Sequence, residues 1–155
     1  MTYNGFKSVV DIDLMGSFNT AKAAYEQLKA TKGSILFISA GQSLDAHAQQ
    51  AHVCAAKAGV DKLMKTLAIE WGPDGIRSNS IVPGPIEGTQ GVKRLTIPKT
   101  LAMLRNAVPV RRLGAVDDIG RAAVFLSSEF ASYVTGVMLP VDGGFLTGPP
   151  AQWEN

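Results

Sequence analysis

The sequence predicts an α/β domain in which about three parallel strands are flanked by helices. Apolar residues recur at spacings of 3 and 4 in three segments, short apolar runs rich in β-forming residues follow them, and Gly or Pro separates the segments. The predicted order is helix, strand, helix, strand, helix, strand. This alternation implies right-handed crossovers and a parallel sheet with helices on both faces. We therefore expect residues 1–155 to form a single domain.

The first helix is predicted from about Phe6 to Lys29. Its apolar stripe contains Val10, Leu14, Phe18, Ala21, Tyr25 and Leu28. Gly33 ends this helix and opens a strand over Ser34–Ser39. That strand is a continuous apolar run, which is typical of a strand covered on both faces. A polar stretch follows from Gly41 to Gln50.

The second helix is predicted over about His52–Trp71. Its stripe contains Val53, Ala56, Val60, Leu63, Leu67 and Trp71. Gly72-Pro73-Asp74-Gly75 stops this helix, because proline cannot continue the hydrogen-bond ladder and glycine accepts turn dihedrals. A second strand is expected over Ile76–Val82, where Pro83-Gly84-Pro85 ends it.

The rest of the chain is a long connection followed by one helix and one strand. The connection runs from about Glu87 to Val110 and includes a predicted short helix at Lys99–Arg105. Connections of this length are often functional lids. The third helix is expected from about Val116 to Ser127 or Ser128, since two carboxylates near its start favour a helix N-terminus. The last strand is expected over Val137–Val141, closed by Asp142-Gly143-Gly144.

Composition excludes several classes of function. Fifteen Lys and Arg against 13 Asp and Glu give a net charge of +2, and the basic residues are scattered, which argues against nucleic-acid binding. The longest apolar-leaning stretch without charge, Phe130–Val141, is too short to span a membrane. One cysteine, Cys54, allows no intrachain disulfide, and with two histidines it shows no metal-ligand spacing. The first ten residues do not have the pattern of a secretory signal.

Two charged residues stand on or beside apolar stripes. Lys57 lies on the stripe of the second helix, where it either snorkels and pairs with Asp61 or finds another partner. Asp13 lies mid-helix, too far from either end to act as a cap, and is either a solvated acid or an inward one. If the two helices pack on the same face of the sheet, an inward Asp13 would neutralise Lys57 and could pass protons.

Three further sequence features each allow a structural or a functional role. His52 opens the second helix and is expected to be a satisfied core or capping histidine, and Cys54 is expected to be a small buried apolar residue. Pro83-Gly84-Pro85-Ile86 follows a strand of a parallel sheet, so it is either a rigid turn or the floor of a ligand site.

No glycine turn of the form G-x-G-x-x-G occurs in the sequence, so no motif in it holds a pyrophosphate at a helix N-terminus. Three parallel strands also make a small sheet. We expect the chain to be either the C-terminal part of a larger enzyme or a shortened product whose sheet edge a partner covers.

Taken together, these segments resemble the short-chain dehydrogenase/reductase family over essentially the whole chain. The resemblance is carried by Asp13–Phe18, Ile35–Ser39, Ala55–Val60, Ile76–Ile86, Tyr133–Gly136 and Asp142–Gly144. It implies a partial Rossmann-like parallel sheet, the C-terminal part of that fold. The glycine-rich cofactor turn and the first strands would belong to an N-terminal half.

Departures from the family pattern point to one branch. The usual catalytic tyrosine position holds Val53, the usual serine position holds Ala40, and a common asparagine position holds Asp13. Ordinary ketone or alcohol chemistry needs that tyrosine as general acid. The peroxisomal-type 2,4-dienoyl-CoA reductases lack the tyrosine, keep the lysine and have an aspartate at the position of Asp13, so the chain looks similar to them.

This resemblance implies NADPH-dependent reduction of a 2,4-dienoyl-CoA to a 3-enoyl-CoA in unsaturated fatty acid degradation. Asp13 and Lys57 would be the catalytic residues, and Lys57 would also bind the nicotinamide ribose. The backbone of Pro83, Gly84, Pro85 and Ile86 would hold the carboxamide. The fatty acyl-CoA substrate would contact Gln42, and Lys93 and Arg94 would meet the CoA phosphates.

The resemblance also carries expectations about assembly and location. In this family the first two helices of the present chain commonly form an interface between subunits, which implies a homo-oligomer. Two alternatives remain open: another short-chain reductase acting on enoyl or oxoacyl thioesters, or a non-catalytic assembly module. The branch implies a peroxisomal location, but the sequence ends Trp153-Glu154-Asn155 without the Ser-Lys-Leu-like tripeptide, so a cytoplasmic location is the other expectation.

Overall fold

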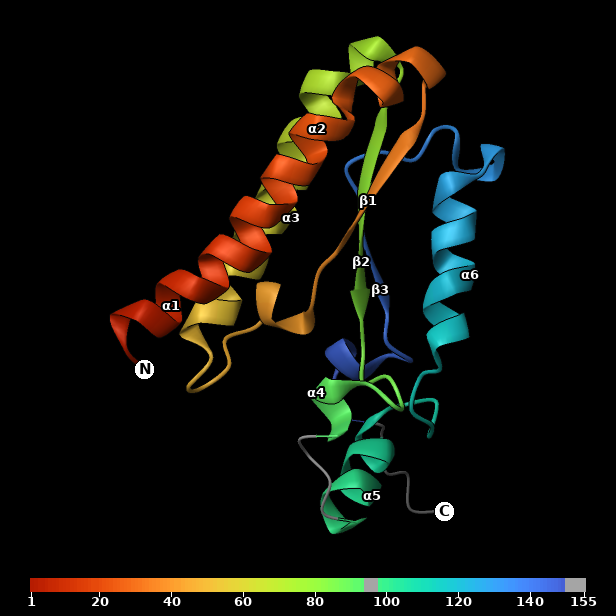
Figure 1. Ribbon diagram of the computed structural model, residues 1–155. Helices are drawn as coiled ribbons and strands as arrows, with labels where there is room; N and C mark the ends of the chain where they lie inside the picture. Colours follow the sequence, from red (N-terminus) through yellow and green to blue (C-terminus); the bar gives the residue numbers. More distant parts are fainter. Residues whose placement is uncertain (94–97, 150–155) are drawn as a thin grey trace.

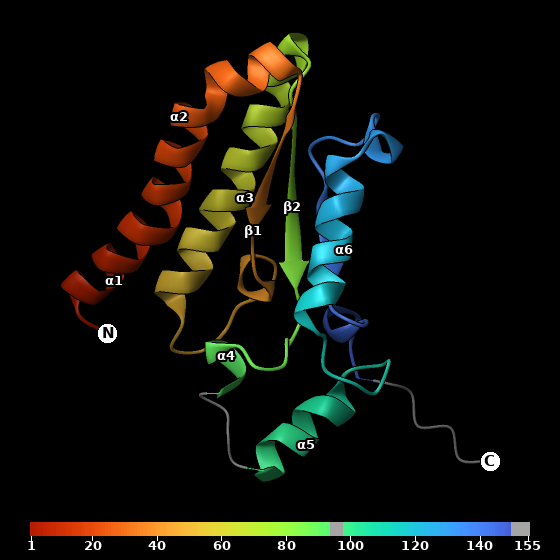
Figure 2. The same cartoon turned by 45° about the vertical axis from the view of Figure 1, so that its right-hand side comes forward.

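The computed structural model describes residues 1–93 and 98–149. It has three layers, with α2 and α3 on one face of a sheet and α6 on the other, as Figures 1 and 2 show. The sheet has three parallel strands in the order β1-β2-β3. This confirms the predicted α/β class and its small parallel sheet.

The first helix is longer than predicted and contains a π-helical turn. It runs through α1 (Tyr3–Val10), the π turn Asp11–Met15 and α2 (Gly16–Thr31) without a break. The π turn adds a residue to one turn and so rotates the residues after it around the helix axis. Phe18, expected on the buried stripe, is 42% exposed, whereas Ser17 beside it is half-buried.

The middle of the chain follows the prediction closely. β1 (Ser34–Ile38) leads through a 3-10 turn to α3 (Ala51–Trp71). The stop after α3 is a second 3-10 turn, after which Gly75 takes a left-handed φ of 82°. β2 (Arg77–Pro83) is displaced by one residue from the expected strand.

The long connection contains more helix than expected. It holds α4 (Gln90–Lys93), which was not predicted, and α5 (Pro98–Ala107), which extends beyond the expected Lys99–Arg105. α6 (Val116–Ser127) and β3 (Met138–Val141) then complete the fold. Figure 1 shows α4 and α5 at the end of the molecule where β2 ends.

The core lies between the sheet and the helices α2 and α3. Its central members are Ala21, Phe37, Val60, Met64 and Leu67, all almost fully buried. β2 is the most buried strand because it has a neighbour on each side, and its Ile81 and Val82 are 0% exposed. The predicted stripe of the second helix therefore faces the core.

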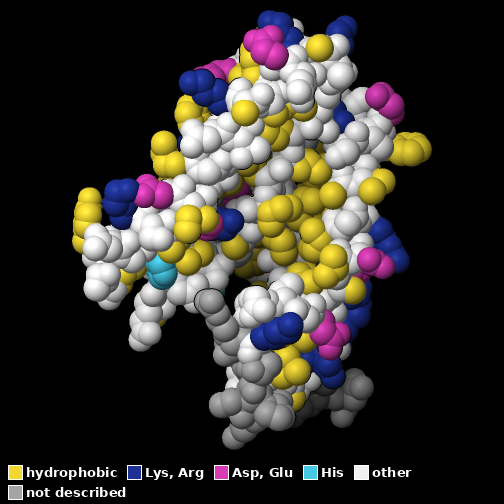
Figure 3. Space-filling view, viewed as in Figure 1, with side chains coloured by type: hydrophobic (Ala, Val, Ile, Leu, Met, Phe, Trp, Pro, Cys, Tyr) yellow, Lys and Arg dark blue, Asp and Glu magenta, His cyan; other side chains and the backbone are white. Residues whose placement is uncertain are grey.

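The outer edge of β1 has no strand beside it in residues 1–93 and 98–149. A groove follows this edge, between Ile35–Ile38 of β1 and Ile12, Gly16, Ser17 and Thr20 of the first helix. Ile38 is 51% exposed, and Figure 3 shows hydrophobic side chains gathered over this part of the molecule, between the helices α2 and α3 and the helix α6. An apolar, unpaired edge of this kind can pair with another strand.

The described residues contain neither a membrane-spanning helix nor a cluster of metal ligands. None of their helices is long and apolar enough to cross a membrane. Nor do their His, Cys, Asp and Glu side chains form a group of three that could hold a metal ion.

Candidate active site

Lys57 and Asp13 meet between α3 and the π turn of the first helix. The Nζ atom of Lys57 lies 3.6 Å from Oδ2 of Asp13. The two side chains are 21% and 29% exposed, respectively, so the pair is partly buried and still reached by solvent. Of the two interpretations of Asp13, the structure supports the inward acid that neutralises Lys57.

A close helix contact sets this pair. A Cβ atom at Gly59 of α3 would lie 2.8 Å from Cδ2 of Leu14 in the π turn, so the glycine allows the two helices to approach. Leu14 is next to Asp13, and Gly59 is two residues after Lys57. The same contact that packs the helices therefore brings the carboxylate to the ammonium group.

The end of β1 provides the second partner of Lys57. Its Nζ atom donates a hydrogen bond to the carbonyl oxygen of Ile38, the last residue of β1, at 3.1 Å. The expected alternative, a pair between Lys57 and Asp61, is wrong. Asp61 is 4% exposed and accepts hydrogen bonds from the hydroxyls of Ser39 and Ser80, because its side chain points towards the sheet.

The predicted cofactor loop Pro83–Ile86 begins at the carboxyl end of β2, next to the end of β1 in the same parallel sheet. Its backbone is fixed by two neighbours. Gly84 N–H donates to the carbonyl of Val141 at 3.1 Å, and Gly114 N–H donates to the carbonyl of Pro85 at 3.0 Å. Lys57 and this loop thus lie at the edge of the sheet formed by the carboxyl ends of its strands, where ligands of open parallel sheets bind.

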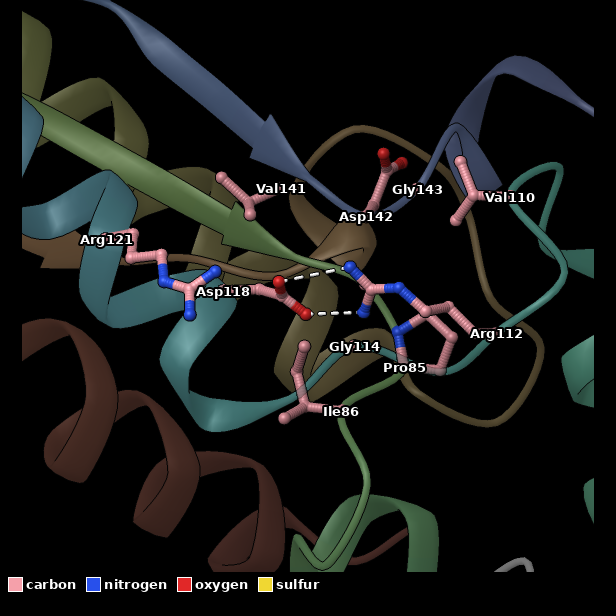
Figure 4. Close-up of a pocket in the computed structure, with 11 residues that line it drawn as sticks. Pro85, Ile86, Val110, Arg112, Gly114, Asp118, Arg121, Val141, Asp142 and Gly143 are labelled. Atoms are coloured by element: carbon pink, nitrogen blue, oxygen red, sulfur yellow. Dashed lines mark hydrogen bonds and ion pairs between the residues drawn. The ribbon is translucent and has the colours of Figure 1, made fainter.

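A pocket of about 190 Å³ lies beside this loop, between the ends of β2 and β3. Figure 4 shows that Arg112 reaches across it to Asp118. The Arg112 guanidinium donates to both carboxylate oxygens of Asp118, at 2.6 and 3.1 Å. These bonds, together with the N–H of Ala115, lower the pKa of Asp118 to about 2.

The Arg112–Asp118 pair was not predicted as a site feature. The pair closes the segment from Arg112 to Asp118, which contains Gly114. Gly114 bonds to both sides of Ile86, because its N–H donates to the Pro85 carbonyl and its own carbonyl accepts the Glu87 N–H at 2.8 Å. The available signal was an arginine six residues before an acid in the first turn of a helix. That spacing alone does not show that the two side chains meet.

The three predicted substrate residues lie in different parts of the chain. Gln42 lies in the 3-10 turn after β1, and its Nε2 donates to Oε1 of Gln50 at 3.0 Å. Lys93 is an exposed residue at the end of α4. Arg94 lies outside the described residues.

His52 and Cys54 differ from expectation. The Nδ1 atom of His52 is buried and has no hydrogen-bond partner among the described residues, so this histidine is not satisfied. It also does not cap α3, which begins without a side-chain cap. Cys54, expected to be buried, is half-buried in the first turn of α3, and its Sγ atom lies 4.0 Å from the Asp45 carbonyl oxygen.

The residues at this edge fit the nicotinamide end of a dinucleotide. An ammonium group has three donors, and the two partners of Lys57 leave one for a ribose hydroxyl. The tight packing of Gly84, where a Cβ would lie 2.6 Å from Cα of Asp142, fixes the loop backbone beside it. The phosphate end has no matching glycine turn in the 155 residues.

Comparison with known proteins places these features in a family. A family model described as enoyl-(acyl carrier protein) reductase matches residues 1–146. The chain is 55% identical over 141 residues to a peroxisomal 2,4-dienoyl-CoA reductase of Saccharomyces cerevisiae, covering 91% of the chain and 48% of the relative. It is 42% identical over 146 residues to the corresponding Rattus norvegicus protein, covering 93% and 50%. The chain thus spans about half the length of these curated relatives.

Solved structures agree with this placement. A short chain dehydrogenase from Bacillus anthracis has a TM-score of 0.84 at 38% identity, covering 93% of this chain and 57% of that one. A gluconate 5-dehydrogenase from Burkholderia cenocepacia, in complex with NADP and tartrate, has a TM-score of 0.88 at 29% identity, covering 95% and 58%. Since the family model, the relatives and the fold all agree, the chain belongs to the short-chain dehydrogenase/reductase family.

Proposed function

We propose that this chain carries the proton-handling residues of an NADPH-dependent reductase that converts a 2,4-dienoyl-CoA to a 3-enoyl-CoA. The observation that carries the proposal is the Asp13–Lys57 pair, with Oδ2 and Nζ 3.6 Å apart, in a chain with Val53 where this family usually has its catalytic tyrosine. An acid beside a lysine replaces the missing phenol as the source of a proton. The relatives named as 2,4-dienoyl-CoA reductases support the same substrate class.

Reduction of a conjugated dienoyl thioester needs a hydride and a proton. NADPH, when bound, supplies the hydride to the far end of the diene. The electron pair then moves towards the thioester carbonyl, where the positive charge of Lys57 stabilises the dienolate oxygen. Asp13 and Lys57 together hold a water that delivers the proton to the α carbon, which leaves the 3-enoyl thioester.

The remaining site residues have binding roles in this proposal. Lys57 also donates to the nicotinamide ribose, and the backbone from Pro83 through Gly84 and Pro85 to Ile86 binds the carboxamide. Gln42 lies beside the acyl group, and Lys93 and Arg94 contact the CoA phosphates. Peroxisomal relatives support a peroxisomal location.

The proposal is tested by titrating the purified chain with NADPH and following nicotinamide fluorescence, with and without a 2,4-dienoyl-CoA. Loss of NADPH absorbance is then measured with dienoyl, enoyl and 3-oxoacyl thioesters. Binding that strengthens with the dienoyl thioester, followed by its preferred reduction, supports the proposal. Preference for another thioester would assign the site to a different short-chain reductase, and absence of binding would contradict the proposal for this chain.

We further propose that the chain self-associates through its first two helices. The support is apolar surface on these elements, since Met15 and Phe18 of the first helix are 46% and 42% exposed and Ile69 of α3 is 79% exposed. Light scattering of the purified chain tests this. A monomer would contradict it, and a dimer without NADPH binding would favour a non-catalytic assembly module.

A further inference from the structure

A buried carboxylate lies one helical turn after Lys57. Asp61 is 4% exposed, and no ion pair with it is found in the part of the chain that the structure describes. Its Oδ2 accepts a hydrogen bond from Ser39 Oγ at 2.5 Å, and its Oδ1 accepts one from Ser80 Oγ at 2.8 Å. A buried carboxylate is costly unless such donors satisfy it, so this arrangement needs a reason.

The two hydroxyls come from adjacent strands. Ser39 follows the last residue of β1 and is 4% exposed, and Ser80 lies inside β2 and is 0% exposed. Ser43 Oγ lies 3.1 Å from Ser39 Oγ, in the turn that also contains Gln42. Asp61 therefore joins α3 to the residue after β1, to the middle of β2 and, through Ser39, to the turn that follows β1.

The link from Ser39 to Lys57 passes through one peptide group. Ser39 N–H donates to the carbonyl of Ile81 in β2 at 2.8 Å. Because a trans peptide is planar, the Ile38 carbonyl points to the opposite side, towards the open edge of β1. Lys57 Nζ donates to that carbonyl at 3.1 Å.

We propose that Asp61 is a positioning residue for Lys57, and this inference rests on the function proposed above. By holding the Ser39 side chain, Asp61 fixes the orientation of the Ile38–Ser39 peptide. The Ile38 carbonyl in turn holds the Lys57 ammonium where it meets Asp13. Asp61 forms no hydrogen bond or ion pair with Lys57 among the described residues, so it acts on Lys57 only through β1.

Chemical labelling of Lys57 tests this without any need for reductase activity. The full chain is treated with a limiting amount of an acetylating reagent, and mass spectrometry gives the modification rate of Lys57 relative to the exposed Lys62 and Lys65 of the same helix. The test variants are Ser39→Ala, which keeps the carboxylate, and Asp61→Asn. Ser78→Ala is the matched control, because Ser78, like Ser39, is a buried serine whose hydroxyl donates to α3, here at the Met64 carbonyl.

The proposal expects Lys57 to be labelled about fivefold faster in Ser39→Ala and Asp61→Asn, the factor that loss of one ordinary hydrogen bond allows. Ser78→Ala should lose stability without changing the relative labelling of Lys57. Equal labelling of Lys57 in Ser39→Ala and the wild type would overturn the proposal, as would the same increase in Ser78→Ala. If Asp61→Asn does not fold, the comparison of Ser39→Ala with Ser78→Ala decides.

The same variants separate this inference from the proposed reaction. If the chain reduces dienoyl thioesters, Ser39→Ala should lower kcat and leave KM for the acyl-CoA unchanged, whereas Ser78→Ala should change neither. If no reduction is found but the labelling differs as expected, the proposed function fails while the positioning of Lys57 by Asp61 stands.

Discussion

Lys57 of α3 holds its ammonium group between two acceptors, the Asp13 carboxylate at 3.6 Å and the Ile38 carbonyl at 3.1 Å. One acceptor comes from the π turn of the first helix and the other from the end of β1. The ammonium, carried by α3, is therefore held by two further elements, while 21% of the side chain stays exposed. A lysine that is both held in place and accessible is what the proposed function requires of Lys57.

Asp13→Asn and Lys57→Met should each lower the rate of dienoyl thioester reduction by about 100-fold or more, the contribution typical of a positioned proton donor. The matched control is Asp11→Asn, because Asp11 lies in the same π turn but is exposed and pairs with Lys7. NADPH absorbance measures the rates. Wild-type turnover in Asp13→Asn would remove Asp13 from the mechanism.

Gly59→Ala should not gain the stability that this substitution normally gives a helix. Alanine favours a helix over glycine by about 1 kcal/mol. At position 59, however, the new Cβ would lie 2.8 Å from Leu14 Cδ2 and 3.2 Å from Leu14 Cδ1, so the Leu14 side chain in the π turn must shift. Gly120→Ala in α6 is the matched control, since its Cβ would meet nothing within 4 Å.

Urea unfolding should therefore rank Gly120→Ala above wild type and Gly59→Ala at or below it. If the shift of Leu14 moves the π turn, any reductase activity of Gly59→Ala should also fall, because Asp13 precedes Leu14 in that turn. Equal stabilisation by both substitutions would mean that the helix contact is loose and does not set the Asp13–Lys57 distance.

Much of the fold could be predicted because its signals are local. The stripe of α3 and the run that forms β1 need only the spacing of neighbouring residues. The π turn at Asp11–Met15 was missed because one extra residue still fits an apolar pattern that alternates between spacings of 3 and 4. On the predicted stripe after this turn, Phe18 is 42% exposed whereas Ala21 is 1% exposed.

The site could be predicted only in part, because it depends on contacts between distant segments. Asp13 facing Lys57 was one of two open interpretations, and only the packing of the two helices decides between them. The Asp61 network requires that Ser39 and Ser80 meet α3, which no local pattern shows. A usable signal was the polar run Ser78-Asn79-Ser80 inside a strand that a parallel sheet must bury.

Asp118 should make the free energy of unfolding of the chain depend on pH in the acidic range. Its pKa in the folded chain is lowered from 3.8 to about 2, first by the Arg112 side chain and then by the Ala115 N–H. A group with a depressed folded pKa stabilises the fold above its unfolded pKa, and this contribution is lost as pH falls through the folded value. The stabilisation should therefore be complete at neutral pH and should fade between about pH 4 and about pH 2.

Urea midpoints measured across this pH range check the prediction. Asp118→Asn should unfold at lower urea than wild type near neutral pH, and the difference should shrink towards about pH 2. Asp117→Asn is the matched control, because the neighbouring Asp117 forms no hydrogen bond or ion pair among the described residues. A difference that stays constant with pH would show that the Arg112 pair contributes through packing rather than charge.

Gly84→Ala should damage the predicted cofactor loop more than the rest of the fold. A Cβ at this position would lie 2.6 Å from Asp142 Cα and 3.0 Å from the Asp142 carbonyl oxygen, both backbone atoms. Asp142 cannot easily move, since its carboxylate accepts the N–H groups of Gly144 and Leu146, each at 2.8 Å. The loop from Pro83 to Ile86 must shift instead, at a cost of about 1–3 kcal/mol for overpacking.

The matched control is Gly91→Ala in the nearby α4, where the closest atom to a new Cβ would be Thr89 Oγ1 at 3.9 Å. Urea unfolding gives the stability of both variants, and nicotinamide fluorescence gives their affinity for NADPH. We expect Gly84→Ala to be less stable than Gly91→Ala and to lose affinity beyond what its unfolded fraction explains. If Gly84→Ala binds NADPH as wild type does, the loop backbone does not hold the carboxamide, and the cofactor must contact another part of this edge of the sheet.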